Sequence, residues 1–128
     1  MRIKTDIRND VAVLTVSGRL MSGPDVAPFH EKIKALAEEG HVNIVVDFSK
    51  VRWFGSSMLG VMTASYTTLR NAGGELRLTG VLDNSKIHGI LMVTRLNSIF
   101  RTLETVDRAV ASFKTQPPEP IESSSTER

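Results

Sequence analysis

The chain has 128 residues and a formal net charge of +2, with 41% hydrophobic and 23% charged residues, which is typical of one globular domain. It contains no cysteine, and this excludes disulfides, thiolate catalysis and cysteine-ligated zinc. No apolar run reaches the about 20 residues that a membrane-spanning helix needs, and the first residues lack the apolar region of a secretory signal. We therefore expect a cytoplasmic domain without membrane insertion.

The last fourteen residues differ in composition from the rest of the chain. Residues 115–128 contain three prolines, three consecutive serines and three glutamates, and Ile121 is the only strongly apolar residue among them. Such a segment cannot bury enough surface to offset the entropy lost on ordering. We expect one domain over residues 1–114 and a disordered tail over residues 115–128. The basic residues elsewhere are scattered rather than gathered in a stripe, so no direct nucleic-acid partner is expected.

The first predicted elements are two strands and a helix. Ile3, Thr5 and Ile7 alternate with polar residues, and Asn9-Asp10 predict a turn into a second strand over Val11–Ser17. A helix then begins at Pro24 and ends at Gly40. Its apolar residues recur at helical spacing: Val26, Phe29, Ile33 and Leu36.

The rest of the chain alternates strands with helices. Val42–Phe48 is nearly all apolar, as a central strand covered on both faces should be. The predicted elements that follow are a helix with Leu59, Met62, Tyr66 and Leu69 on one face, a strand over Glu75–Thr79, a helix near Ser85–Val93, a strand near Ile99–Leu103, and a helix with Val106, Val110 and Phe113. The alternation predicts an α/β fold, a mixed sheet with an N-terminal antiparallel hairpin and right-handed βα units. If the strands add in one direction, the helices collect on one face.

Candidate catalytic groups are few. The three histidines, His30, His41 and His88, lie far apart and have no second ligand at metal-binding spacing. The stretch from Gly55 to Gly60 approaches a hydrolase elbow, but its second glycine comes one position too late. The common phosphate-binding glycine loops are absent. We expect no enzyme, metal or cofactor, and a small enzyme with Ser56 or Ser57 as nucleophile stays as an alternative.

Two serines, Ser56 and Ser57, stand where the helix after the central strand begins. A serine at the N-cap of a helix satisfies free backbone amides, and this structural role alone could explain the pair.

Five segments resemble the STAS domain of anti-sigma factor antagonists. In chain order they are Val16–Leu20, Val45–Val51, Ser56–Val61, Ala72–Leu78 and Leu91–Phe100. The resemblance covers about residues 3–113, and it implies a single STAS domain with helices packed on the sheet.

The resemblance also implies a partner-switching role. The unphosphorylated domain would bind an anti-sigma factor that is an ATP-dependent serine kinase, phosphorylation of Ser56 (with Ser57 as second choice) would break the complex, and a serine phosphatase would reset it. The implied partner-binding residues are Met21, Ser22, Phe54, Gly55, Ser56, Ser57 and Met58. The alternative is a STAS subunit of a membrane lipid-transport ATPase complex, or a scaffold that is not phosphorylated.

Three positions depart from the family pattern around these serines. Gly55 stands where the family usually has Asp, Met58 where it has Gly, and Met21 where many members have Asp. Together with Phe54, exposed methionines would give the surface around Ser56 an apolar character typical of partner contacts. In the alternative interpretation Phe54 and Met58 fold into the core. Trp53 is expected in the core.

Overall fold

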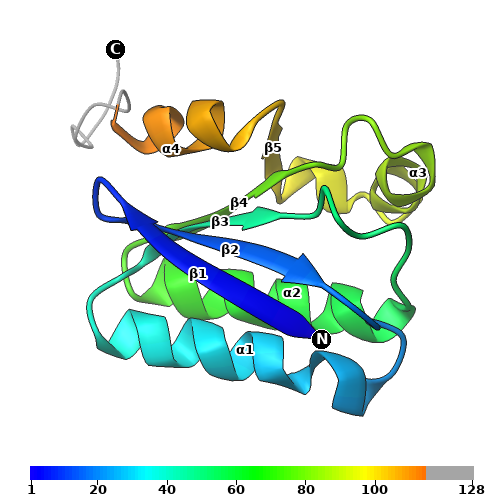
Figure 1. Cartoon of the computed structure of the whole chain (residues 1–128), viewed down its shortest axis with the longest axis horizontal. Coiled ribbons are helices and arrows are strands. Elements are labelled where there is room, and N and C mark those ends of the chain that lie inside the picture. Colours follow the sequence, from blue (N-terminus) through cyan, green and yellow to red (C-terminus); the bar gives the residue numbers. More distant parts are fainter. Residues whose placement is uncertain (115–128) are drawn as a thin grey trace.

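A computed structural model describes residues 1–114 and shows a five-stranded sheet in the order β1-β2-β3-β4-β5 (Figure 1). The elements are β1 (Arg2–Arg8), β2 (Val11–Ser17), α1 (Gly23–Glu38), β3 (Asn43–Asp47), α2 (Ser56–Asn71), β4 (Glu75–Thr79), α3 (Ser85–Val93), a short 3-10 helix (Leu96–Ser98), β5 (Arg101–Leu103) and α4 (Val106–Lys114). The predicted tail, residues 115–128, lies outside the described residues.

The N-terminal hairpin forms as predicted. β1 and β2 pair antiparallel, and Arg8 faces Val11 across a turn of two residues. Asn9 and Asp10 both have positive φ, 53° and 68°, which is the backbone of a two-residue turn that matches the strand twist. Asn and Asp adopt this conformation more readily than most residues.

The remaining neighbours in the sheet are parallel: β2 with β3, β3 with β4, and β4 with β5. The α/β class with a leading antiparallel hairpin is therefore confirmed. Because β2, β3 and β4 run the same way, the loops that follow them meet at one edge of the sheet, on the right in Figure 1. This edge carries the predicted partner-binding residues.

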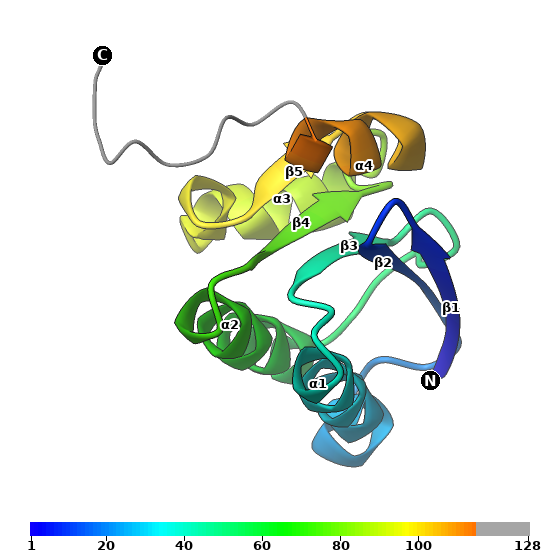
Figure 2. The ribbon, with the colours of Figure 1, turned by 90° about the vertical axis from the view of Figure 1, so that its left-hand side faces the viewer.

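Helices α1 and α2 lie side by side on one face of the sheet (Figure 2). The buried residues of α1 are the four predicted ones, Val26, Phe29, Ile33 and Leu36. In α2 the buried face differs from the predicted one by a rotation about the helix axis. The buried residues are Met58, Met62, Ser65 and Leu69. Leu59 and Tyr66 flank this core as half-buried side chains.

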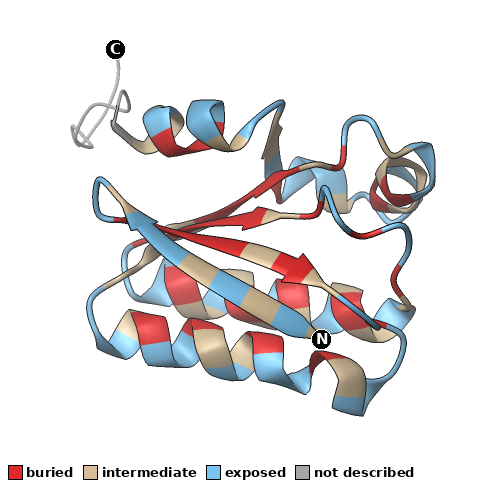
Figure 3. Cartoon of the chain, viewed as in Figure 1, coloured by how far each residue is buried: buried red, intermediate tan, exposed pale blue. Residues whose placement is uncertain are grey.

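The expectation that all helices share one face is wrong, because α4 covers the opposite face (Figure 2). Val11, Val13 and Val45 point to that face and pack against Ala109 and Val110. A strand buried on both sides needs a cover on both sides. α4 follows the last strand and forms no crossover, so it can supply the second cover. Figure 3 shows the result, with burial concentrated on β2, β3 and β4 and with β1 largely exposed.

A buried arginine ties α4 to the sheet. The side chain of Arg77, on β4, is only 1% exposed. Its Nε donates to Glu75 Oε2 at 3.0 Å, and its Nη1 donates to Ser112 Oγ at 2.6 Å. The guanidinium carbon lies 4.0 Å from the ring centroid of Phe113, a cation–π contact. The charge is therefore compensated from both β4 and α4.

We predict that Arg77→Ala lowers the free energy of unfolding by about 3 kcal/mol, because it removes a fully buried side chain and with it the hydrogen bond to Ser112 and the contact with Phe113 that join β4 to α4. Ser112→Ala removes the hydrogen bond from Arg77 and the one that Ser112 Oγ donates to the Ala109 carbonyl oxygen, and it should cost about 1–2 kcal/mol. Urea denaturation of the two variants and the wild type measures both values. A change for Arg77→Ala within about 0.5 kcal/mol of zero, the range of ordinary surface substitutions, would contradict this role.

Candidate functional site

The loops after β2 and β3 meet at Gly55, at the edge of the sheet where the parallel strands end. The Gly55 N–H donates to the carbonyl oxygen of Leu20 at 2.9 Å, so the loop after β3 is bonded to the loop after β2. A Cβ atom at Gly55 would lie 2.5 Å from the Met21 carbonyl oxygen. Only glycine fits this approach without a backbone shift, which explains why no aspartate stands at this position.

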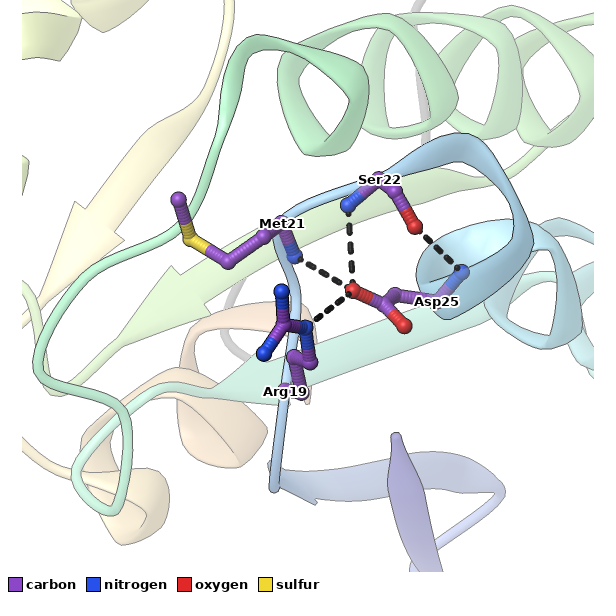
Figure 4. Close-up of polar contacts among 4 residues, drawn as sticks. All are labelled: Arg19, Met21, Ser22 and Asp25. Carbon is purple, nitrogen blue, oxygen red and sulfur yellow. Dashed lines mark hydrogen bonds and ion pairs between the residues drawn. The ribbon is translucent and has the colours of Figure 1, made fainter.

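The loop after β2 is held by the carboxylate of Asp25 in the first turn of α1 (Figure 4). Asp25 Oδ2 accepts from the Met21 and Ser22 amides, each at 3.1 Å, and from Arg19 Nε at 3.2 Å. Ser22 Oγ in turn accepts from the Asp25 amide at 3.3 Å and completes a capping box. Ser22, predicted as a partner contact, is thus exposed and is the N-cap of α1.

These contacts decide the charge state of Asp25. Burial of the carboxyl group opposes its ionisation, but the hydrogen bonds from Met21 and Ser22 and the charge of Arg19 outweigh it, so the pKa of Asp25 lies below its ordinary value. The carboxylate therefore stabilises the loop at neutral pH.

The loop after β3 is held at its beginning by Asp47. Its Oδ1 accepts from the Ser49 amide at 3.0 Å and from the Thr79 hydroxyl at 3.2 Å. Its Oδ2 accepts from the Ser49 hydroxyl at 2.9 Å. The carboxylate thereby links the ends of β3 and β4.

Asn84 joins the same loop to α3. Its Nδ2 donates to the carbonyl oxygens of Val51 and Arg52, both at 3.1 Å. Its Oδ1 accepts from the amides of Lys86 and Ile87, also at 3.1 Å, and caps the first turn of α3. One side chain thus fixes the position of Trp53's loop relative to α3.

Ser56 and Ser57 are the first two residues of α2, and the expectation that the pair caps this helix is wrong. The N-cap is Gly55, which offers no side chain, and the first turn contains no acidic residue. Ser56 is exposed and Ser57 is half-buried. The hydroxyl of Ser56 is therefore accessible at the positive end of the α2 dipole.

Phe54 and Met58 lie in the core, as in the alternative interpretation, and not on an apolar surface around Ser56. Phe54 is 2% exposed and Met58 is 0% exposed, so neither side chain can contact a partner directly. The ring of Phe54 packs against Phe48, with centroids 5.6 Å apart. Trp53, expected in the core, is instead 42% exposed, because Phe54 occupies the core position. Met21 is exposed, as predicted.

Residues 3–104 match the family model described as Mlab, STAS domain. The chain belongs to the STAS domain family. No curated protein matches it in sequence. Among helices within residues 1–114, none has the length and apolar character needed to cross a membrane, and this part of the chain holds no cluster of His, Asp and Glu residues suited to a metal ion.

Solved STAS structures share the fold of this chain. A Thermotoga maritima protein assigned as an anti-sigma factor antagonist is 22% identical, with a TM-score of 0.79 over 88% of this chain and 94% of that one. An anti-sigma factor antagonist domain protein from Planctomyces limnophilus is 18% identical, with a TM-score of 0.77 over 88% and 98%. Bacillus SpoIIAA in its phosphorylated form is 16% identical, with a TM-score of 0.67 over 88% and 99%.

Sequence reasoning missed the roles of Asn84 and Asp25 in holding the loops at this STAS domain's edge. Asn84 stands directly before a predicted helix, where an N-cap asparagine is favoured, and that position could have identified its capping role. The spacing of Ser22 and Asp25 resembles a capping box and could have marked the start of α1. Their contacts with the neighbouring loops have no local sequence signal.

We predict opposite effects for two glycine substitutions in and beside α2. Gly55→Ala should lower the free energy of unfolding by about 1–3 kcal/mol, because the new methyl group collides with the Met21 backbone. Gly60→Ala should raise it by about 0.5–1 kcal/mol, because Gly60 is an exposed helical residue with open space around it. Urea denaturation measures both. Equal effects would show that the approach of Gly55 to Met21 is not constrained.

We predict that Asp25→Asn destabilises the domain at neutral pH and that this difference fades in acid. The folded-state pKa of Asp25 is lowered, so its contribution is fully present above the ordinary aspartate pKa of about 4 and is lost as the pH falls through the folded value. Urea denaturation of both proteins, from neutral pH down through the folded-state pKa of Asp25, measures the difference in stability. Glu31→Gln, an exposed position in the same helix, is the matched control. A difference between Asp25→Asn and wild type that is independent of pH would contradict the role of ionisation.

Proposed function

We propose that this STAS domain is an anti-sigma factor antagonist of a cytoplasmic partner-switching pathway. Its unphosphorylated form binds an anti-sigma factor that is also an ATP-dependent serine kinase, and phosphorylation of Ser56 releases that partner. The observation that carries the proposal is the exposed Ser56 hydroxyl in the first turn of α2, on an edge whose loops are fixed by Gly55, Asp25 and Asn84.

The proposed modification is a phosphoryl transfer from ATP. Ser56 Oγ attacks the γ-phosphorus, the bond from that phosphorus to the β-phosphate oxygen breaks, ADP leaves, and the hydroxyl proton goes to solvent or a base of the kinase. A serine phosphatase hydrolyses the phosphoester and restores the hydroxyl. This domain supplies only the acceptor oxygen, so it needs no cofactor of its own.

Exposure favours Ser56 over Ser57 as the acceptor. Ser56 is exposed and Ser57 is half-buried, and a kinase must reach the hydroxyl oxygen from solvent. Ser57 also precedes the fully buried Met58, so a phosphate there would lie closer to the core.

The position explains how phosphorylation could prevent docking without unfolding the domain. A phosphate adds about −1.5 to −2 charges. The first turn of α2 contains no acidic residue to repel it, and the helix dipole favours a negative charge at this end. At an interface, the same charge must be desolvated against a surface that had accepted a hydroxyl group. The cost therefore falls on the complex rather than on the fold.

A protein with the same fold supports the proposal that this domain can be phosphorylated. SpoIIAA, which shares the fold, has been solved in phosphorylated and unphosphorylated forms. The departure at Gly55 affects recognition by a kinase, because the backbone contact with Met21 leaves no space for a side chain there. In the transport-subunit or scaffold alternative, the domain binds its partner without phosphorylation. The following experiment distinguishes that alternative from the phosphorylation switch.

We predict that Ser56→Asp weakens binding to the purified anti-sigma factor kinase of the same organism by about tenfold or more, whereas Ser56→Ala binds like wild type and is not released by ATP. Ser57→Asp is the matched control, since it places the same charge in the same helical turn. Calorimetric titration measures the affinities, and thermal melts show whether each variant is folded.

Equal affinities for folded Ser56→Asp and wild type would contradict the switch and favour the transport-subunit or scaffold alternative. Phosphorylation of Ser56→Ala at the wild-type rate would identify a different acceptor, with Ser57 as the first candidate.

A further inference from the structure

We propose that a groove between Trp53 and α3 binds a bulky apolar side chain from an acidic segment of a protein partner. The groove is lined by Trp53, Ser85, Lys86, Gly89, Ile90 and Val93 and has a volume of about 560 Å³. We call it the Trp53 groove. It begins three residues before Ser56 on the same loop, and as a second contact of the same partner it rests on the proposed function.

One wall of the Trp53 groove is a fixed aromatic ring. Trp53 stacks on Phe54, with ring centroids 6.3 Å apart and planes 16° apart. Phe54 is itself buried, and the loop is bonded to Asn84 through Arg52. The exposed indole therefore loses little conformational entropy on binding, which is a property of tryptophan at interface hot spots.

The other wall is the outward face of α3. Ile87 and Leu91 point into the core, whereas Lys86, Ile90 and Val93 lie on the groove side. Val93 is 80% exposed, and no residue of the described chain covers it. An apolar wall is thus presented to solvent.

Gly89 keeps the Trp53 groove open. Outside its own stretch of helix, no atom lies within 4 Å of the position that a Cβ of Gly89 would take. A glycine within a helix costs about 0.5–1 kcal/mol relative to alanine, and neither the packing nor the backbone φ requires it here. The hollow it leaves is the space for a partner side chain.

The charged residues around the Trp53 groove indicate which side chains should lie beside the partner's apolar anchor. Ser85 and Lys86 line the Trp53 groove and also an adjoining cleft that contains Lys50, Arg52 and Asp83. Three cations and one acid surround these two hollows. A segment with acidic side chains beside its apolar anchor would be attracted to this surface, and a basic segment would be repelled.

The concave shape favours a protein segment over a lipid surface. Peripheral proteins that bind membranes insert protruding apolar side chains into the interface, whereas the apolar side chains here line a hollow, open to solvent, between a ring and a helix. A concave site with an aromatic anchor is the arrangement that accepts a partner's side chain.

The chain contains one tryptophan, so its fluorescence reports directly on the Trp53 groove. The probe is a short synthetic helical peptide with two leucines one turn apart among glutamates and alanines. We expect a saturable blue shift of the Trp53 emission on titration into the full chain. Two matched peptides, one with alanine for the leucines and one with lysine for the glutamates, should bind about tenfold more weakly or not at all.

Gly89→Leu is the decisive variant, because it fills the hollow and improves helix propensity, so the protein should stay folded. We expect this substitution to lower the affinity for the acidic peptide by about tenfold or more. Gly60→Leu makes the same change at an open position on α2 and should bind like wild type. Lys86→Glu should weaken binding of the acidic peptide and strengthen binding of the lysine peptide.

Equal responses to all three peptides, or unchanged binding to Gly89→Leu, would overturn the proposal. So would an emission shift with phosphatidylglycerol vesicles but not with peptide, which would indicate a membrane site, or a shift with protein concentration alone, which would indicate a second copy of the chain. The peptide titration does not involve Ser56. If the acidic peptide binds as expected while Ser56→Asp leaves anti-sigma factor binding unchanged, the proposed function is contradicted and the Trp53 groove proposal is supported. If the peptide does not bind while Ser56→Asp weakens anti-sigma factor binding, only the Trp53 groove proposal is contradicted.

Discussion

The approach of the Gly55 backbone to the loop after β2 is the contact on which the functional edge depends. One hydrogen bond, from Gly55 to Leu20, joins the loops after β2 and β3, and the Met21 carbonyl oxygen occupies the space of a side chain at Gly55. This contact sets where α2 begins, and it therefore sets where Ser56 is presented. It also excludes an acidic side chain beside the serine, so the negative charge of a phosphate would stand alone at this helix end.

Three polar side chains hold the loops at this edge, each through several hydrogen bonds. Asp25 fixes the loop after β2, Asp47 links the ends of β3 and β4, and Asn84 joins the loop after β3 to α3. Because these contacts are internal, a modification of Ser56 can change the charge of the surface without changing its shape. The proposed switch at Ser56 would act on the affinity of a rigid surface and would need no conformational change. Trp53 extends the same surface towards α3.

Much of the fold could be predicted because its signals are local. The alternation in β1, the Asn9-Asp10 turn and the spacing of the buried residues in α1 each lie within a few consecutive positions. The side of the sheet that α4 covers is decided by strands distant in sequence, and no local pattern records it. Trp53 and Phe54 show the same limit at the site: two adjacent aromatic residues in a loop have no period, so only the packing of Phe54 on Phe48 decides which one is buried.

Hydrogen exchange at the Gly55 amide tests most directly whether the edge is a rigid surface that changes only in charge. The full chain would be compared with the same chain carrying phosphoserine at position 56. The account predicts that the Gly55 amide, bonded to Leu20, is strongly protected and keeps its protection within a few-fold after phosphorylation. A loss of protection that reaches the amides of Met21 and Ser22 would show that phosphorylation melts the loops, and it would contradict the account.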